Sequence, residues 1–477
     1  MSRQALLLML IILAPAVLAQ WESDLRLTTD ASVSQTSANS GWCVAASNDT
    51  VHVIWFDYRD AGDKVFYRRS TNGGIAWGPE TKLTDTASAS MVPNLSLAVA
   101  SQGLVHIVWC DYIRGQDDEI FYKRSTDGGT TWLPDTQLTR DDFRVEADSW
   151  VSIAAWNLLT HVVWHDFKWD GLRYSWNIFY KRSTDGGVSW QPDQRLTAYP
   201  ATSGPPSVAA YGALAHVVWY DMRTGNAEIF CKRSTDAGAT WQPDTALTND
   251  PAGSYLPSIG VSGNQIHVSW FDERDGNKEL YYKRSLDGGL TWGPDVRLTN
   301  DPVDSYRPSV AVSGNSIHLV WYDNRDGNTE IFYKRSTDNG VSWSPDTSLT
   351  NDASDSFYPS VALSGTKVHV VWTDNRDANQ EIYYKRNPFG NIGIEENRIS
   401  KPSAPRWRAV PNPFRSFARA IGRDNDWFVV YSASGRIVGR YQGRMIGSDL
   451  PSGIYFVGPS NAGPGANWQP VRLVKIR

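Results

Sequence analysis

Residues 308–350 read PSVAVSGNSIHLVWYDNRDGNTEIFYKRSTDNGVSWSPDTSLT. The stretch contains four strand-like runs rich in β-branched and aromatic residues, and Gly-Asn, Arg-Asp-Gly-Asn and Asp-Asn-Gly separate them. Turn residues between such runs predict four short antiparallel strands. The first three runs are apolar on both faces, as expected for a sheet that is covered on both sides.

A similar stretch occurs seven times between residues 20 and 390. A single histidine marks the register, and a tryptophan follows three residues after each of them. The histidines are His52, His106, His161, His216, His267, His318 and His369. Four strands per unit, at a spacing of 51 to 55 residues, are typical of a propeller blade. The sequence therefore predicts an all-β protein whose residues 20–390 form a seven-bladed β-propeller with four-stranded blades.

The two ends of the repeat region complement each other. The seventh unit lacks its fourth strand, whereas WESDLRLT at residues 21–28 matches WGPDVRLT at residues 292–299. We expect the N-terminal strand to complete the last blade, because a closed ring leaves no unpaired sheet edge.

The N-terminus has the pattern of a secretory signal peptide. Residues 1–19 combine Arg3, an apolar run and the small-residue site Val17-Leu18-Ala19. No later run reaches the roughly 18 apolar residues of a membrane-spanning helix, so we expect no transmembrane segment. Residues 391–409 are rich in Pro, Ser, Asn and Gly and are interpreted as a linker.

The turn between the third and fourth strands carries the motif S-x-D-x-G-x-[ST]-W, for example STDGGTTW at residues 125–132. The motif resembles the Asp box of sialidases and related propellers, with five full copies and a weaker one at residues 70–77. We expect a structural role, because the carboxylate can accept N–H groups of its own turn. The Asp-box carboxylates are Asp127, Asp185, Asp236, Asp287 and Asp338.

Charge and cysteine content exclude some classes of protein. The chain has 46 Lys and Arg against 51 Asp and Glu, a net charge of −5, and residues 398–477 alone hold 13 basic and three acidic residues. An acidic body argues against nucleic acid as a partner. Cys43, Cys110 and Cys231 fall on separate predicted strands, so we expect buried free thiols.

The loop between the second and third strands reads D-x-R-D-G-N in its commonest form and lies on the face opposite the Asp boxes. It carries Arg274, Arg325 and Arg376, which are candidates for holding a carboxylate ligand. Each arginine follows an aspartate by two residues, so an internal Asp–Arg pair is the alternative; calcium binding is a third. The repeat histidines occur once per blade and are interpreted as core residues. We expect no metal site and no cofactor.

The third repeat departs most from the others, and a single ligand site needs such asymmetry. Its loop TRDDFRVEADSW at residues 139–150 supplies the candidate catalytic carboxylates Asp141, Asp142 and Glu146. A second loop, HDFKWDGLRYSWN at residues 165–177, is predicted to be about four residues longer than its equivalents. It supplies the ligand-binding candidates Lys168, Trp169, Arg173, Tyr174 and Trp176. A decorative insertion that packs on itself is the alternative.

Resemblance to sialidases implies an arginine triad, a Tyr/Glu pair and an acidic Asp, usually on six blades with an F/Y-R-I-P motif near the start. The nearest match here is Tyr306-Arg307-Pro308, late in the chain and without the Ile. We therefore expect a propeller that binds glycan or another extracellular polymer. A sialidase-like glycoside hydrolase and a protein-interaction scaffold are the alternatives.

Residues 410–477 differ in pattern from the repeats, with short alternating strands that predict a small β-sandwich. The segments PNPF, YSASGRIV and LPSGIYFV, followed by a basic terminal strand, resemble the C-terminal sorting domain of type IX secretion substrates. The resemblance implies the type IX machinery as a partner. It also implies a protein that is secreted from a Gram-negative bacterium or attached to its outer surface.

Overall fold

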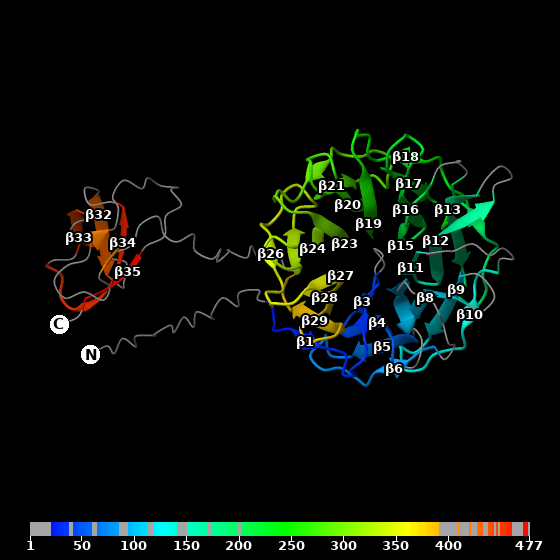
Figure 1. Ribbon diagram of the computed structural model, residues 1–477, viewed down its shortest axis with the longest axis horizontal. Coiled ribbons are helices and arrows are strands. Elements are labelled where there is room, and N and C mark those ends of the chain that lie inside the picture. The colour runs from blue at the N-terminus through cyan, green and yellow to red at the C-terminus, as the bar shows by residue number, and fades with distance from the viewer. Residues whose placement is uncertain are drawn as a thin grey trace, which may run out of the picture. The chain divides into compact units, whose positions relative to one another are not determined.

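The computed structural model describes residues 21–37, 42–59, 64–84, 94–112, 118–140, 150–169, 174–197 and 202–390, and short segments between 409 and 475. The chain divides into two compact units, Met1–Glu395 and Glu396–Arg477. In the first unit, seven antiparallel sheets are arranged in a ring with their innermost strands around a common axis (Figure 1). This confirms the predicted seven-bladed propeller.

The strands of blades 1 to 4 follow each other from the axis outward. Blade 1 comprises β2 (Ser34–Gln35), β3 (Val44–Ser47), β4 (Thr50–Asp57), β5 (Lys64–Ser70) and β6 (Thr81–Lys82). Blade 2 comprises β7 (Leu95–Val99), β8 (Val105–Tyr112), β9 (Asp118–Ser125) and β10 (Thr136–Gln137), with the 3₁₀ turn Ser101–Gly103 after β7. Blade 3 comprises β11 (Val151–Trp156), β12 (Leu159–Trp169), β13 (Tyr174–Ser183) and β14 (Gln194–Arg195). Blade 4 comprises β15 (Ser207–Tyr211), β16 (Leu214–Asp221), β17 (Glu228–Ser234) and β18 (Thr245–Ala246).

Blades 5 to 7 continue the same order. Blade 5 comprises β19 (Ser254–Ser262), β20 (Gln265–Asp272), β21 (Glu279–Ser285) and β22 (Val296–Arg297). Blade 6 comprises β23 (Ser305–Ser313), β24 (Ser316–Asp323), β25 (Glu330–Ser336) and β26 (Thr347–Ser348). Blade 7 comprises β27 (Ser356–Ser364), β28 (Lys367–Asp374) and β29 (Glu381–Asn387), and β1 (Leu25–Arg26) is its outermost strand.

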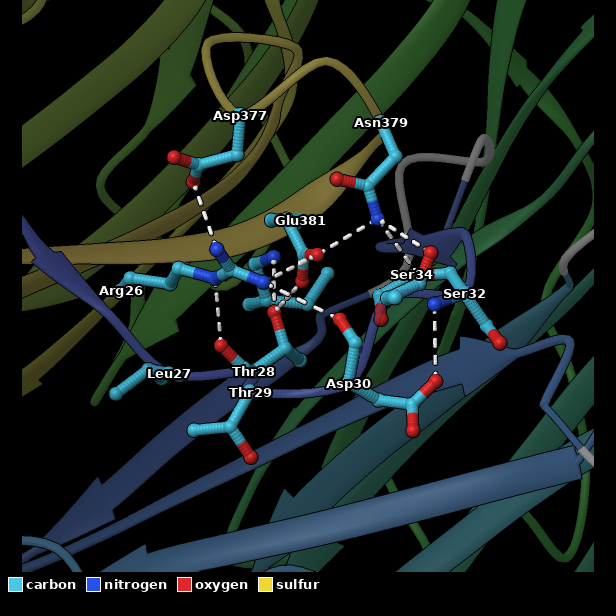
Figure 2. Close-up of polar contacts among 12 residues, drawn as sticks. Arg26, Leu27, Thr28, Thr29, Asp30, Ser32, Ser34, Asp377, Asn379 and Glu381 are labelled. Atoms are coloured by element: carbon cyan, nitrogen blue, oxygen red, sulfur yellow. Dashed lines mark hydrogen bonds and ion pairs between the residues drawn. The ribbon is translucent and has the colours of Figure 1, made fainter.

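The N-terminal strand closes the ring, as the sequence predicts. Leu25 of β1 pairs with Tyr384 of β29, and Arg26 pairs with Tyr383. Figure 2 shows the polar contacts that hold this strand: the Arg26 guanidinium reaches both Glu381 and Asp377, at 3.2 Å from Asp377. The hydroxyl of Thr28 also donates to Glu381. Two segments from opposite ends of the repeat region therefore make one blade.

The Asp-box turns are held by their own carboxylates. Asp127 accepts the Thr131 N–H at 2.9 Å and the Thr131 hydroxyl at 2.6 Å, and the same pattern recurs at the other boxes. These hydrogen bonds outweigh the effect of partial burial and lower the pKa of Asp185 to about 2. The Gly two residues after each Asp, such as Gly129 at φ 78°, supplies the left-handed backbone that the turn needs.

Neighbouring blades are joined by an arginine from the third strand. Its Nη1 donates to a carbonyl oxygen in the Asp-box region of the following blade, for example from Arg69 to Gly128 at 2.6 Å and from Arg124 to Gly186 at 2.7 Å. The contact from Arg386 to Gly73, at 2.7 Å, closes the circle between blades 7 and 1. The ring is thus held on its Asp-box face, the face that carries these turns, by one repeated hydrogen bond.

The histidine and tryptophan that mark the repeat lie in the core between sheets. Each repeat tryptophan is at most 2% exposed. In blade 5 the Nδ1 of His267 lies 2.6 Å from the hydroxyl of Tyr282, and five other blades have the same pair. The repeat histidines are therefore hydrogen-bonded core residues.

The inner strands surround a narrow central channel with a cavity of about 210 Å³. Small apolar side chains line it, among them Ala46, Val99, Ala155, Ala210 and Val312. The channel offers no charged lining residue among those described. Charged side chains that could bind a polar ligand therefore lie outside the channel, at the two ends of the axis.

The second unit is also built from strands. It contains a four-stranded antiparallel sheet of order β33 (Ile437–Gln442), β32 (Trp427–Ser432), β34 (Gly453–Pro459) and β35 (Val471–Lys475). A separate pair consists of β30 (Ala409–Val410) and β31 (Arg419–Ala420). The sorting role of this unit stays a prediction, as do the domain boundaries, since residues 391–408 lie outside the described chain.

Two further expectations bear on the whole chain. Cys43, Cys110 and Cys231 are free and buried, and burial raises the pKa of Cys43 and of Cys231 to about 12. Nothing in the described residues forms a helix of the length and apolar character that crossing a bilayer requires.

Candidate ligand-binding site

The face opposite the Asp boxes carries the loops between second and third strands; we call it the arginine face. Its repeated arginines are held in place by their own blades. Arg274 contacts Asp272 at 2.6 Å and Asp295 at 3.0 Å, and its guanidinium carbon lies 4.3 Å from the ring centre of Tyr281. Burial disfavours the charge, yet the two carboxylates raise the pKa of Arg274 above its ordinary value.

Arg325 and Arg376 repeat this arrangement. Arg325 contacts Asp323 at 2.5 Å and Asp346 at 2.8 Å. Arg376 contacts Asp374 at 2.6 Å and Asp24, of the N-terminal strand segment, at 2.8 Å. This geometry fits the internal Asp–Arg pair that the sequence leaves open as an alternative. A ligand role for Arg274, Arg325 and Arg376 stays a prediction, and the candidate site does not include them.

Four of the eight predicted site residues of blade 3 lie outside the described structure. This holds for Asp141, Asp142, Glu146 and Arg173, and the structure describes only the backbone of Lys168, Trp169 and Tyr174. The backbone of Lys168, Trp169 and Tyr174 belongs to two strands and not to the long loop that the sequence predicts. β12 and β13 instead pair from Thr160–Ser183 to Trp169–Tyr174, so most of the added residues lengthen a hairpin. In the sequence, polar and apolar residues alternate from Asp166 to Trp169, a pattern that is typical of a strand.

Trp176, the described member of this group, packs against its own hairpin. Its ring stacks on His165 with centroids 4.6 Å apart and also contacts Phe167 at 5.2 Å. His165 is 6% exposed, and its Nδ1 accepts the backbone N–H of Trp150 at 3.0 Å. Burial lowers the pKa of His165 to about 3, so this histidine is neutral. Trp176 and His165 together fix the backbone from which the Trp150 side chain extends.

Three β-bulges shape the end of the axis on the arginine face. The register of the first strand shifts between Tyr255 and Ser258, between Tyr306 and Ser309, and between Phe357 and Ser360. The bulges contain Leu256, Arg307 and Tyr358, with φ of 47°, 50° and 53°. Non-glycine residues in this region are strained, and such strain collects at functional sites. Bulges also redirect side chains, here near the channel mouth.

Arg307 is the unusual residue of the three. Its guanidinium carbon lies 4.8 Å from the ring centre of Tyr358 in the next blade and 5.4 Å from that of Trp150 in blade 3. β23 and β11 face each other across the ring, so Arg307 and Trp150 meet over the axis (Figure 1). Both side chains are half-buried. Within the described part of the chain, Arg307 has no carboxylate partner, and its buried Nη1 has no acceptor.

Tyr322 completes the surroundings of Arg307. Burial raises the pKa of Tyr322, and the charge and hydrogen bond of Arg307 oppose part of that rise. The Tyr322 ring also lies 6.0 Å from Tyr358, edge to face. The mouth of the channel therefore has one cation with spare hydrogen-bond donors, surrounded by three aromatic rings. Such a site suits an anionic group, such as a carboxylate or a sulfate, on a ligand that also has an apolar face.

In the sequence, Arg307 stands out only as part of Tyr306-Arg307-Pro308, and no predicted site includes it. A signal was present: blades 5, 6 and 7 are nearly identical, yet the residue before the repeated Pro-Ser is Leu256, Arg307 or Tyr358. Metal chemistry has no comparable support. The described residues include no group of three His, Cys, Asp or Glu placed to hold an ion.

Comparisons with known proteins agree with this architecture. Residues 156–370 match the family model of the BNR repeat-like domain. No curated protein has a sequence that matches this chain.

Solved structures share the fold at low sequence identity. The polysaccharide lyase Uly1 matches with a TM-score of 0.53 and 10% identity, over 77% of this chain and 99% of its own. An ulvan lyase bound to -[GlcA(1-4)Rha3S]- matches with a TM-score of 0.52 and 11% identity, over 76% of this chain and 95% of its own. The Hadza microbial sialidase Hz136 has a TM-score of 0.44 and 17% identity, over 69% and 74%. At these identities the two lyases show a shared fold and nothing more.

Proposed function

We propose that this protein binds an acidic polysaccharide on the arginine face, with Arg307 holding a carboxylate or sulfate group of one sugar. The observation that carries the proposal is the half-buried Arg307 guanidinium, which has no carboxylate partner among the described residues and a buried Nη1 without an acceptor. An anion would satisfy that donor and neutralise the charge. Trp150 and Tyr358 offer ring faces on which the apolar side of a sugar can stack.

The neighbours in structure support a glycan ligand in general terms. Uly1 and the ulvan lyase are named for acting on polysaccharides, and the latter is bound to a saccharide with carboxylate and sulfate groups. Their shared fold brings such ligands into consideration here, whereas the choice of Arg307 rests on its contacts alone.

Native electrophoresis in gels that contain an acidic polymer tests the proposal. Dextran sulfate, hyaluronan, alginate and polygalacturonate serve as acidic polymers, and dextran as the neutral control. We expect at least one acidic polymer to retard the protein and dextran not to. Arg307→Gly should raise the Kd for that polymer at least tenfold, because charge-assisted hydrogen bonds contribute about 1.5–3 kcal/mol. Glycine also suits the φ of 50° at this position, so the variant should fold.

Lys367→Gln is the matched control for loss of one positive charge. Lys367 pairs with the exposed Asp49 at the Asp-box end of blade 7, away from Arg307. This variant should be retarded as strongly as the unaltered protein. Equal loss of retardation in both variants would mean that binding follows net charge, and the Arg307 site would then be wrong.

The hydrolase alternative rests on Asp141, Asp142 and Glu146. It predicts turnover of a fluorogenic sialoside, and turnover that Asp141→Ala or Asp142→Ala abolishes would establish it. Retardation without turnover favours the binding function for that substrate.

We further propose that the protein is exported and sorted by its last 68 residues, on the basis of the sequence patterns at residues 1–19 and 410–477. Fractionation of a type IX-competent host tests this. The full chain should appear outside the cell, and a chain that ends at residue 409 should stay in the periplasm.

A further inference from the structure

Aromatic rings form a continuous path across four blades of the arginine face. We call it the aromatic arc. Successive ring centres lie 5.3, 5.4, 6.1, 5.6, 6.0 and 4.9 Å apart. Its members are Tyr220, Tyr255, Phe271, Tyr306, Tyr322, Tyr358 and Phe357. The arc passes beside Arg307 through Tyr322 and Tyr358.

Cross-strand pairing builds the arc. Tyr255 lies opposite Phe271, and Tyr306 opposite Tyr322, so each pair stacks at the end of its blade. In blade 4, Gly204 takes the place of the inner ring, and an added Cβ would lie 2.0 Å from Tyr220. The absence of that side chain lets Tyr220 lie where its ring contacts Tyr255.

A cavity of about 340 Å³ lies beside the middle of the arc, lined by residues of blade 6 and of the connection that leads into it from blade 5. Tyr306 and Tyr322 line it, together with Asp304, Asn324 and Thr329. Its volume is in the range of small-molecule sites. Two tyrosine rings beside a carboxylate, an amide and a hydroxyl match a sugar ring, which has an apolar face and hydroxyl groups around its edge.

Two carboxylates line this cavity; Asp323 is paired with Arg325, which leaves Asp304 as the main source of negative charge. The Asp304 carboxylate accepts the Lys278 N–H at 2.9 Å and the Tyr306 hydroxyl at 2.7 Å. Burial opposes ionisation, yet these hydrogen bonds hold the pKa of Asp304 below its ordinary value. The ammonium group of Lys278 lies 4.0 Å away and compensates only in part. An anionic sugar is therefore disfavoured here, whereas a neutral sugar can donate its hydroxyls.

We infer that this cavity binds a neutral sugar next to the acidic sugar held by Arg307, so that the ligand is a polysaccharide of alternating acidic and neutral units. The inference rests on the proposed function. Arg307 directly follows Tyr306 in β23, and Tyr322 contacts both the cavity and the Arg307 guanidinium. The two subsites thus share Tyr322, which places consecutive units of one chain on them.

A comparison of two kinds of polymer tests the inference on the full chain. Hyaluronan and chondroitin alternate acidic and neutral sugars, whereas alginate and polygalacturonate are acidic throughout. We expect at least one alternating polymer to bind ten times more tightly than both of the others. Asp304→Asn keeps the shape of the side chain but removes its charge. It should reduce this preference at least fivefold, by weakening the alternating polymer and strengthening the acidic ones.

Asp275→Asn is the matched control. Asp275 lies on the arginine face in blade 5 and accepts the Tyr281 hydroxyl at 2.6 Å, as Asp304 accepts that of Tyr306, but it does not line the cavity. This variant should leave the preference unchanged, and both variants should melt within a few degrees of the unaltered protein.

The outcomes separate the two proposals. If alternating and fully acidic polymers bind equally, or if Asp304→Asn and Asp275→Asn shift the preference alike, the neutral subsite is wrong while the Arg307 site stands. If no acidic polymer binds, or if Arg307→Gly leaves binding intact, the proposed function fails and the inference fails with it.

Discussion

All seven repeat histidines are buried, six of them beside a tyrosine hydroxyl and His216 beside the Gly288 oxygen, and burial couples their protonation to folding. Burial, aided by a nearby cationic side chain, lowers the pKa of His267 to about 3. The same cause lowers the pKa of His52, His106 and His369 to about 3, and that of His161 and His216 to about 4. In the unfolded chain these groups return to about 6.5.

Stability should therefore fall as pH falls from about 6.5 toward 4. In this window the unfolded state binds protons that the folded state excludes, so protonation favours unfolding. We expect the urea midpoint to be constant from pH 8 to 7 and to decline below 6.5. The aspartates of the Asp boxes contribute in the same direction, but only below their ordinary pKa of about 3.9. Urea titrations at half-unit steps measure the curve.

His267→Asn is the control for the histidine effect. An amide can still bond to Tyr282 but does not titrate. The variant should be less stable at pH 7.5, and its decline between pH 6 and 4.5 should be shallower by about 1.4 kcal/mol per pH unit. A midpoint that does not change from pH 7 to 5 would refute the argument.

At the scale of elements, the junction between blades 4 and 5 departs from the other blade contacts. Elsewhere a tyrosine of the third strand packs edge-on against a tryptophan of the next blade, as Tyr67 does against Trp132 at 4.9 Å. β17 has Cys231 in that place. His216 turns instead toward blade 5, where its Nε2 lies 3.1 Å from the Gly288 oxygen, and its Nδ1 has no partner among the described residues.

Cys231→Tyr should strengthen this junction. The hydroxyl would meet the Nδ1 of His216 and the ring would meet Trp292, as in the neighbouring blades. Substitutions toward a repeat consensus commonly stabilise by about 0.5–2 kcal/mol. We expect a higher Tm in calorimetry. Tyr282→Cys, the reverse change in blade 5, should lower Tm, since it leaves a cavity. A lower Tm for Cys231→Tyr would mean that His216 cannot leave Gly288.

Strands can be predicted from the sequence where the repeat pattern marks them. The His–x–x–Trp register and the turn residues define strands such as β24 and β25, because burial on both faces imposes one pattern seven times. The bulges at Leu256, Arg307 and Tyr358 were not predictable, since an extra residue before Pro-Ser resembles ordinary variation. The hairpin of β12 and β13 was mistaken for a loop, because its turn residues and aromatic residues both occur at ligand sites.

The candidate site was harder to predict than the fold for a related reason. Sequence directs attention to blade 3, where composition changes most, and Trp150 does lie at the channel mouth. Its partner Arg307 comes from blade 6, on the other side of the ring, where the sequence is most regular. Only closure of all seven blades brings these two residues together, and no local sequence pattern indicates that they are close in space.

At the scale of the whole molecule, stability depends on one non-covalent closure. Blade 5 holds its outer strand through Glu279, which binds Arg297 at 2.8 Å and Thr299 at 2.5 Å. Blade 7 makes the equivalent contacts through Glu381 to Arg26 and Thr28, but from a strand at the other end of the chain (Figure 2). The contacts are alike, whereas the connection between the strands differs.

Glu381→Ala should therefore destabilise the propeller more than Glu279→Ala. Each change removes a buried carboxylate and leaves its donors unpaired, a local cost of about 1–3 kcal/mol. In blade 5 the outer strand stays beside its partner because a short turn joins them. In blade 7, release of β1 opens the ring and exposes the edge of β29, and re-forming the pair requires closure of a loop of more than 350 residues. Urea midpoints and the rate of tryptic cleavage after Arg26 measure the difference. Equal midpoints and equal cleavage rates would show that the remaining contacts of β1 hold the ring closed without Glu381.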